Sequence, residues 1–284
     1  MKIMNWGLFE ITRKEVQFSR VYGIENNPKL LARILPYGIP VDQTIKFVIE
    51  DKINYLSYLE MQESVPKGII FVFNSSNPLE AIFVFIPKMT DVLRNPPSTE
   101  STLELDVEER VPKPVKITNL DKGIFSILAS LPVVILGESK EILNILNMLF
   151  YSFPVEIRQK FTFVSQSSSL SENVRIIGMP YTEETSNKLD QEKGKFTIFH
   201  LGDRVYGEHS SQLCKKIALL IQEGEYEQSK NILADFYQLI QESDELPSAL
   251  EFSRQYNLHL SNAQLALMMR ANHFGKAIPK ELLE

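Results

Sequence analysis

One segment constrains the fold of this chain more than any other: LPVVILGESKEILNILNMLFYSFPVEIRQKFTFVS, from Leu131 to Ser165. It opens with a short apolar run, Val133 to Leu136, which predicts a buried strand. The chain then turns at Gly137 and becomes apolar nearly all round from Ile142 to Phe150, which predicts a helix buried on most sides. A second apolar strand, Phe161 to Val164, follows. The order strand, helix, strand predicts an α/β fold in which the two strands are a parallel pair joined by a right-handed crossover.

Composition narrows the class of protein. With 284 residues, of which 44% are hydrophobic, the chain can fill one large core or two ordinary ones. A net charge of −6 argues against a nucleic-acid-binding surface, because phosphate contacts need clustered Lys and Arg. The single cysteine, Cys214, excludes an internal disulfide and favours the cytosol. No apolar run approaches the ~18 residues of a membrane span, so we expect no integral membrane segment.

The first 94 residues predict one α/β domain. Strand patterns cover Trp6 to Glu10 and Val16 to Tyr22, and Asn27 with Pro28 predicts the start of a short helix. Ile45 to Glu50 and Tyr55 to Leu59 predict a hairpin with one solvent face. Two runs without alternation, Gly68 to Phe73 and Ala81 to Phe85, predict central strands, with a helix from Lys88 to Arg94.

The composition changes abruptly between Asn95 and Lys116, where prolines, serines and threonines give way to acidic residues and further prolines. Few of these side chains are suited to burial, and the prolines interrupt any helix or strand ladder. We therefore expect four parts: a domain over residues 1–94, a flexible linker over 95–116, an α/β core over 117–207 and a helical subdomain over 208–284. The last part carries four helix patterns, over Leu213 to Gln222, Glu225 to Gln241, Pro247 to Tyr256 and Ser261 to Phe274. Ser210 and Ser211 are suited to cap the first of these helices.

Catalytic and metal-binding motifs are largely missing from the sequence. The phosphate-binding pattern G-x-x-x-x-G-K-[ST] does not occur, and LGES at Leu136 to Ser139 predicts a capped turn rather than an anion site. A catalytic nucleophile with its base could be read into three residues, His200, Asp203 and Cys214. However, Cys214 falls in an amphipathic helix pattern, where thiols are usually buried and inert. An enzyme acting on small molecules is therefore disfavoured, and no cofactor or metal is expected.

The helices from Phe252 to Arg270 have the layout of a helix-turn-helix DNA reader. Acidic residues, among them Asp244, Glu245 and Glu251, surround them, so no basic stripe forms. A small helical docking module is the favoured interpretation.

The order of elements from Leu128 to Asp203 resembles the central part of a DENN domain. The matching pieces are Val133 to Gly137, Ile142 to Phe150, Tyr151-Ser152-Phe153-Pro154, Phe161 to Val164, Ile176-Ile177-Gly178 and Phe196 to Asp203. The first ninety residues are similar to a longin domain, which precedes DENN in that family. The segment FPVEIRQKFTF also resembles modules of prokaryotic GTPase-associated proteins.

The resemblance implies a longin-like α/β domain followed by a DENN-like α/β sheet domain with a C-terminal helical subdomain. It also implies a regulator of a small Ras-like GTPase that acts through protein surfaces, in the cytoplasm or at a membrane through a partner. Assisted hydrolysis would need an arginine that reaches the γ-phosphate. The candidates, beside the linker and beyond the last strand, are Arg94, Arg110 and Arg204.

The alternative hypothesis is an interaction scaffold or assembly component with no effect on nucleotide state. The chain has 17 Phe and 10 Tyr, which can serve an exposed sheet edge as well as cores. A homo- or heterodimer through the longin-like domain fits this alternative.

Overall fold

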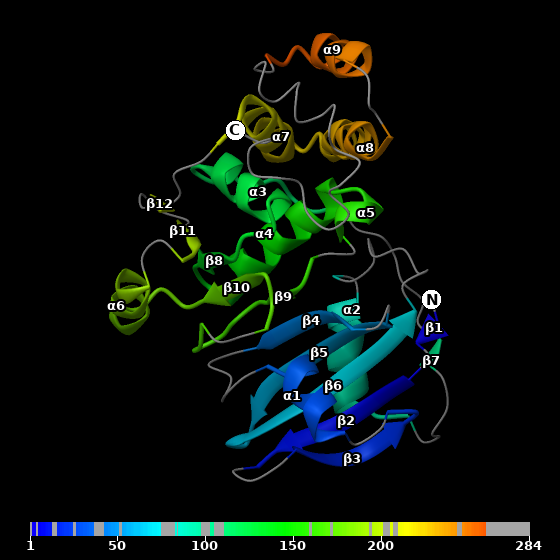
Figure 1. Ribbon diagram of the computed structural model, residues 1–284. Coiled ribbons are helices and arrows are strands. Elements are labelled where there is room, and N and C mark those ends of the chain that lie inside the picture. The colour runs from blue at the N-terminus through cyan, green and yellow to red at the C-terminus, as the bar shows by residue number, and fades with distance from the viewer. Residues whose placement is uncertain are drawn as a thin grey trace. The chain divides into compact units, whose positions relative to one another are not determined.

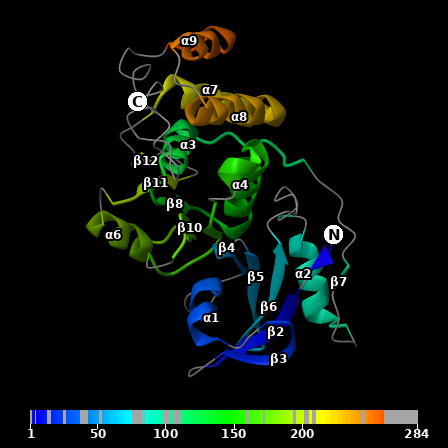
Figure 2. The same cartoon turned by 45° about the vertical axis from the view of Figure 1, so that its right-hand side comes forward.

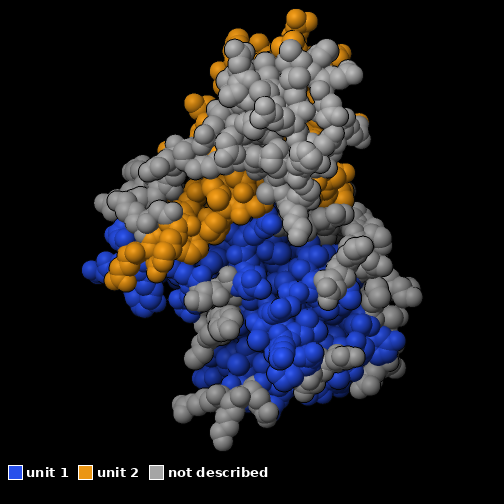
Figure 3. Space-filling model, in the orientation of Figure 1, with its two compact units in different colours: residues 1–111, 136–143, 159–190 blue, residues 112–135, 144–158, 191–284 orange. Residues whose placement is uncertain are grey.

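The structure is a computed structural model, and it describes residues 2–3, 5–12, 16–24, 27–36, 43–50, 53–74, 83, 85–97, 103–104, 111–158, 161–170, 173–192, 195–200, 205–206, 210–242 and 246–259. It has two compact units (Figure 3). Unit 1 consists of residues 1–111, 136–143 and 159–190, and unit 2 consists of residues 112–135, 144–158 and 191–284.

Strands and helices are interspersed along the described chain, and the main sheet is mixed, which confirms the α/β class (Figure 1). The strands are β1 (Lys2–Ile3), β2 (Asn5–Ile11), β3 (Val16–Tyr22), β4 (Thr44–Glu50), β5 (Ile53–Gln62), β6 (Val65–Asn74), β7 (Leu103–Glu104), β8 (Val133–Leu136), β9 (Phe163–Val164), β10 (Ile176–Met179), β11 (Thr197–His200) and β12 (Val205–Tyr206). The helices are α1 (Pro28–Ile34), α2 (Phe85–Arg94), α3 (Leu120–Leu128), α4 (Ser139–Ser152), α5 (Val155–Arg158), α6 (Glu183–Gln191), α7 (Gln212–Glu223), α8 (Tyr226–Glu242) and α9 (Leu246–Gln255).

Unit 1 is built on a mixed sheet. Its strands lie in the order β10-β9-β4-β5-β6-β2-β3. The five strands from β4 to β3 in that order are antiparallel throughout, whereas β10 runs parallel to β9. The register places Leu56 of β5 between Phe47 of β4 and Phe71 of β6. Because these three side chains are fully buried, the middle of the sheet is the core of the unit.

Helices α1 and α2 lie on opposite faces of this sheet, as the two views show (Figure 2). Leu31 and Ile34 of α1 belong to one apolar cluster with Leu59 and Ile70 of the sheet. On the other face, the ring of Phe85 at the start of α2 lies with its centroid 5.6 Å from that of Phe73. Both faces of the central strands are therefore covered, as the unbroken apolar run in β6 predicts.

Helix α1 begins as the sequence predicts. The side chain of Asn27 accepts hydrogen bonds from the backbone N–H groups of Lys29 and Leu30, and Pro28 occupies the first helical position. Proline suits this position because its missing N–H would have no partner inside the helix.

The predicted solvent face on the hairpin of β4 and β5 is wrong. Lys46 and Ser57 are fully buried beneath α1. The Lys46 ammonium donates to the carbonyl of Leu35 at 2.9 Å, and the Ser57 hydroxyl donates to the carbonyl of Ile34 at 3.0 Å. These polar side chains satisfy carbonyls that the end of α1 leaves without partners inside the helix, so the hairpin is covered rather than half exposed.

The strand predicted from Ala81 to Phe85 is wrong at its C-terminal end. Ala81, Ile82 and Val84 lie outside the described residues, and Phe85 begins helix α2. An apolar run of this length does not separate a strand from the start of a buried helix. Phe85 and Met89, one turn apart and both fully buried, form the face of α2 that covers the sheet.

The predicted direct pairing of the two strands in the segment from Leu131 to Ser165 is also wrong. Strand β9 has β10 on one side and β4 on the other, so its neighbours do not include β8. Phe163 of β9 lies opposite Phe47 of β4, and their ring centroids are 5.9 Å apart. Apolar contact with a strand that is distant in the sequence therefore decides where β9 is placed.

Unit 2 is mainly helical in the part of the chain that is described. Helix α3 is buried along nearly its whole length, and α4 carries Ile145, Leu146 and Leu149 into the core. The Ser211 hydroxyl accepts a hydrogen bond from the Cys214 N–H and caps α7, as predicted. Strands β11 and β12 pair antiparallel. Among the described residues, no helix has both the length and the apolar character needed to cross a bilayer.

The compact units differ from the predicted domain ranges. Residues 136–143 and 159–190, expected in the core over 117–207, belong to unit 1. The physical reason is the pairing of β9 with β4, which adds later strands to the first sheet. Of the predicted linker, residues 98–102 and 105–110 lie outside the described part, and so does the fourth predicted helix, from Ser261 to Phe274.

Candidate interaction surface

Of the three candidate arginines, the structure describes one. Arg94 is the last residue of α2, and its side chain is exposed. Arg110 and Arg204 lie outside the described residues, so only Arg94 is placed relative to other groups. The C-terminal end of a helix carries a partial negative charge, which favours a cation at this position.

Polar side chains of β5 lie close to Arg94. The Tyr58 hydroxyl donates to Glu60 Oε2 at 2.5 Å, and the Gln62 amide donates to Glu60 Oε1 at 2.7 Å. The three residues alternate along the strand and therefore share one face of the sheet. Thr90, one turn before Arg94 on α2, also interacts with the Tyr58 hydroxyl. We call Tyr58, Glu60, Gln62, Thr90 and Arg94 the α2-end cluster.

The electrostatics of Tyr58 reflect its place in this cluster. Burial raises the pKa of the Tyr58 phenol, and the hydrogen bond to Glu60 raises it further. The positive charge of Arg94 acts on that pKa in the opposite direction, which places the guanidinium within electrostatic reach of the phenol. Tyr58 therefore remains a neutral hydrogen-bond donor at physiological pH.

The cluster leaves its arginine available to a partner. Both carboxylate oxygens of Glu60 accept hydrogen bonds from neutral donors. Arg94 forms no hydrogen bond or ion pair with another residue that the structure describes. A guanidinium presented in this way is suited to a carboxylate or phosphate supplied by another molecule.

Sequence reasoning placed Arg94 but missed the rest of the cluster. The signal was the alternation of Tyr58, Glu60 and Gln62 over the last residues of the strand. That alternation shows which side chains share a face. It does not show that the helix ending at Arg94 lies over the same face.

The turn LGES is capped from within the chain. The backbone N–H of Glu138 donates to Glu141 Oε2 at 3.2 Å, and the Ser139 hydroxyl donates to the carbonyl of Gln43 at 3.2 Å. A carboxylate three residues into the helix thus takes the place that an external anion would occupy, as in a capping box. This geometry agrees with the predicted capped turn.

The thiol of Cys214 is unsuited to nucleophilic chemistry. It is fully buried in α7, and burial raises its pKa to about 12. The thiolate is the nucleophilic form, so this side chain stays inert at neutral pH. Asp203, which the sequence places near it in a catalytic hypothesis, lies outside the described residues.

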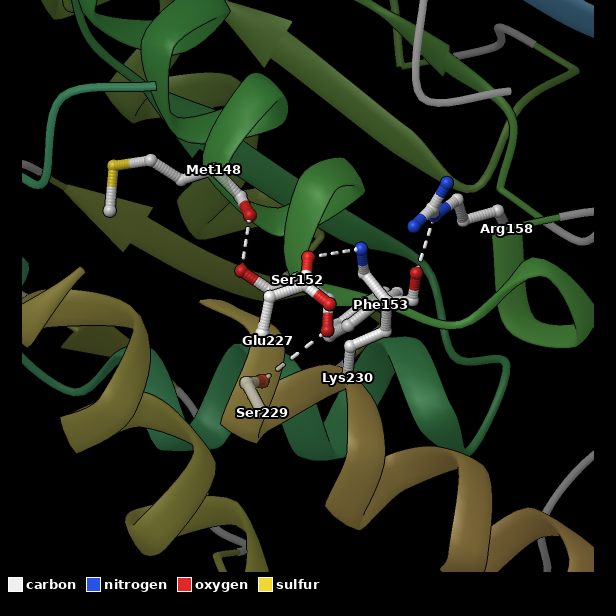
Figure 4. Close-up of polar contacts among 7 residues, drawn as sticks. All are labelled: Met148, Ser152, Phe153, Arg158, Glu227, Ser229 and Lys230. Atoms are coloured by element: carbon white, nitrogen blue, oxygen red, sulfur yellow. Dashed lines mark hydrogen bonds and ion pairs between the residues drawn. The ribbon is translucent and has the colours of Figure 1, made fainter. Parts of the chain in front are cut away.

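Unit 2 contains a buried polar cluster that joins α4, α5 and α8 (Figure 4). Arg158 is fully buried, donates through Nε to the carbonyl of Phe153, and lies 5.9 Å from the centroid of the Phe150 ring. The Ser229 hydroxyl of α8 donates to the carbonyl of Ser152 at 3.3 Å. The cluster satisfies carbonyls at the end of α4, and its role is to hold the helices together.

The remaining polar groups of Figure 4 lie at the start of α8. Lys230 forms an ion pair with Glu227 at 2.7 Å, and its ammonium lies 5.0 Å from the centroid of the Tyr151 ring of α4. Cation–π contact of this kind adds to the attachment of α8 to α4.

Within the described residues, no group of three or more His, Cys, Asp or Glu side chains is arranged to hold a metal ion. No known protein family matches the chain, and no curated protein was found to be related to it.

Proposed function

We propose that this protein binds a small Ras-like GTPase and changes its nucleotide state, by promoting exchange or by assisting hydrolysis. The observation that carries the proposal is the exposed guanidinium of Arg94, at the end of α2 and beside the Tyr58–Glu60 pair, with no partner among the described residues. A GTPase carries two kinds of anionic group that a guanidinium can bind, the phosphates of its nucleotide and the acidic residues of its switch segments.

The arrangement of unit 1 supports the longin-like part of the proposal. A hairpin (β2 and β3), a helix (α1), three strands (β4 to β6) and a second helix (α2) follow one another. They form an antiparallel sheet in the order β4-β5-β6-β2-β3. This is the hairpin, helix and strand order on which the resemblance to a longin domain rests.

The chain order of the later elements supports the DENN-like part. The elements β8, α4, β9, β10 and β11 occur at the positions quoted for the resemblance. In one respect the structure differs from an arrangement of two separate sheet domains, because β9 pairs with β4 of the first sheet. The α2-end cluster does not depend on this pairing, since all of its residues belong to the N-terminal part of unit 1.

The two mechanisms make different demands on Arg94. Exchange needs a surface that holds the switch segments away from the phosphates and Mg²⁺, and Arg94 would contribute by pairing with an acidic switch residue. Assisted hydrolysis needs a guanidinium at the γ-phosphate, a contribution of about 10³–10⁵ in rate where it exists.

A pull-down separates these mechanisms. Small GTPases from the same source would be loaded with GDP, loaded with a GTP analogue, or stripped of nucleotide, and then captured on the full chain. Preference for the stripped form supports exchange, and preference for the analogue-bound form supports assisted hydrolysis or an effector role. The absence of binding in every state contradicts the proposal.

A scaffold without effect on nucleotide state is the second candidate, and the edge of the unit 1 sheet favours it. Strand β3 pairs with β2 on one side and ends the strand order on the other. Its side chains alternate between half-buried and exposed over most of its length. A strand that ends a sheet, as β3 does among the described strands, can pair with a strand of another chain. Light scattering at tens of micromolar tests the self-association form of this candidate, since a strict monomer contradicts it.

A further inference from the structure

The segment from Pro112 to Ile117, which we call the strap, joins unit 2 to the chain before it and lies wholly within that unit. Its residues Pro112 to Lys116 belong to the predicted flexible linker, and the whole strap forms neither helix nor strand. Its two ends are anchored, because Pro112 is buried and Ile117 is only 4% exposed. Every residue between them is exposed.

Three side chains from three helices hold the strap by its carbonyl groups. The Tyr226 hydroxyl of α8 donates to the carbonyl of Pro112 at 3.0 Å. The Asn144 amide of α4 donates to the carbonyl of Lys113 at 3.3 Å, and the Gln222 amide of α7 donates to the carbonyl of Ile117 at 3.2 Å. The strap thus contacts α4, α7 and α8 through side-chain donors.

The sequence of the strap suits recognition through carbonyls alone. Pro112 and Pro114 have no N–H group to satisfy, and proline favours an extended backbone whose carbonyls point outward. Among the described residues, no hydrogen bond runs from a backbone N–H of the strap to an acceptor. The ring of Pro114 lies beside Gly224, which ends α7 with a positive φ of 82°.

The strap is held much more weakly than the helix that follows it. Helix α3 begins three residues after Ile117 and buries almost every side chain, whereas the strap buries only its ends. Segments with few buried apolar contacts open locally at a lower free energy than the global unfolding of their domain.

We propose that the strap is a releasable latch: it leaves α4, α7 and α8 while unit 2 stays folded, and its release uncovers the Tyr226 hydroxyl together with the Asn144 and Gln222 amides. The latch does not depend on the GTPase proposal, because every contact that holds it lies within unit 2.

Trypsin cleavage of the full chain measures the opening of the latch. The bond after Lys116 is the reporter, since the bond after Lys113 precedes Pro114 and resists trypsin. The bond after Lys122, inside α3, is the internal reference for unfolding of the unit. Both rates would be followed by mass spectrometry in the absence of urea and at low urea concentrations.

A latch predicts that cleavage after Lys116 proceeds without urea and changes little at low urea, while cleavage after Lys122 accelerates. Gln222→Ala and Tyr226→Phe each remove one donor, so each raises the Lys116 rate roughly two- to tenfold. Gln228→Ala is the control on α8, because Gln228 donates to Glu225 at the surface and, among the described residues, has no hydrogen bond to the strap.

Two results would overturn the latch. One is a common urea dependence for the two bonds, which means that the strap opens only when unit 2 unfolds. The other is an unchanged Lys116 rate in a folded Gln222→Ala variant. If Tyr226→Phe or Gln222→Ala fails to fold, Asn144→Ala removes the third donor and is measured in the same way.

Discussion

The ammonium of Lys46 donates a hydrogen bond to the backbone carbonyl of Leu35, 2.9 Å away, where helix α1 ends. Leu35 is the residue at which the helix stops, and Lys46 is fully buried in β4. A cation at this position meets both an unsatisfied carbonyl and the negative end of the helix dipole. The contact explains why a lysine lies in the middle of a covered sheet.

Lys46→Met should lower the free energy of unfolding by about 1–3 kcal/mol, because it keeps the length of the side chain but leaves a buried carbonyl without its donor. Urea unfolding measures the change. The control is Lys67→Met, which removes a half-exposed ion pair with Glu10 and should cost less than about 1 kcal/mol. Equal losses in the two variants would show that the Lys46 contact adds nothing.

Asn54→Leu should stabilise the protein. Asn54 lies in β5 opposite Phe73, is fully buried, and its amide has no hydrogen-bond partner within the described ranges. A buried amide without a partner costs about 1–3 kcal/mol, and leucine has a similar shape without that cost. The matched change is Ser57→Ala in the same strand, which removes a hydroxyl that does have partners and should destabilise. A loss of stability in Asn54→Leu would contradict this account.

The buried thiol predicts how stability depends on pH. Burial raises the pKa of Cys214 from 9.0 to about 12, so the unfolded chain loses this proton first. The contribution of this group is therefore complete below about pH 8.5 and is lost as pH rises toward about 12.

Two measurements check the Cys214 prediction. Iodoacetamide at pH 8 should label the native protein far more slowly than the urea-unfolded protein. Cys214→Ala should weaken the decline of unfolding free energy between pH 8 and pH 10. Rapid labelling of the native protein at pH 8 would show that the thiol is accessible.

Local signals predicted most of the helices and strands. The caps formed by Asn27 and Ser211 mark the starts of α1 and α7, and the apolar runs at Val133 and Gly68 mark β8 and β6. These signals depend on residues within a few positions of one another, which is why they can be recognised in a single sequence.

The errors arise where contacts between distant residues decide the structure. In the sequence, Lys46 indicates a solvent-exposed face of its strand, but in the structure α1 covers that face. Phe163 pairs with Phe47 although more than a hundred residues separate them in the chain. The same applies to the α2-end cluster. Arg94 could be proposed from its position beside the linker, but its relation to Tyr58 and Glu60 depends on how α2 packs on the sheet.

The most direct test of the proposed function is the affinity of the full chain for the GTPase captured in the pull-down, compared between two arginine variants. Arg94→Ala removes the exposed guanidinium of the α2-end cluster. Arg33→Ala removes an exposed guanidinium on α1, where it forms an ion pair with Glu50 at 3.1 Å. We predict that Arg94→Ala weakens binding at least about tenfold, as loss of a central interface arginine does. We also predict that Arg33→Ala leaves binding unchanged. Equal affinities for wild type and Arg94→Ala would contradict the account.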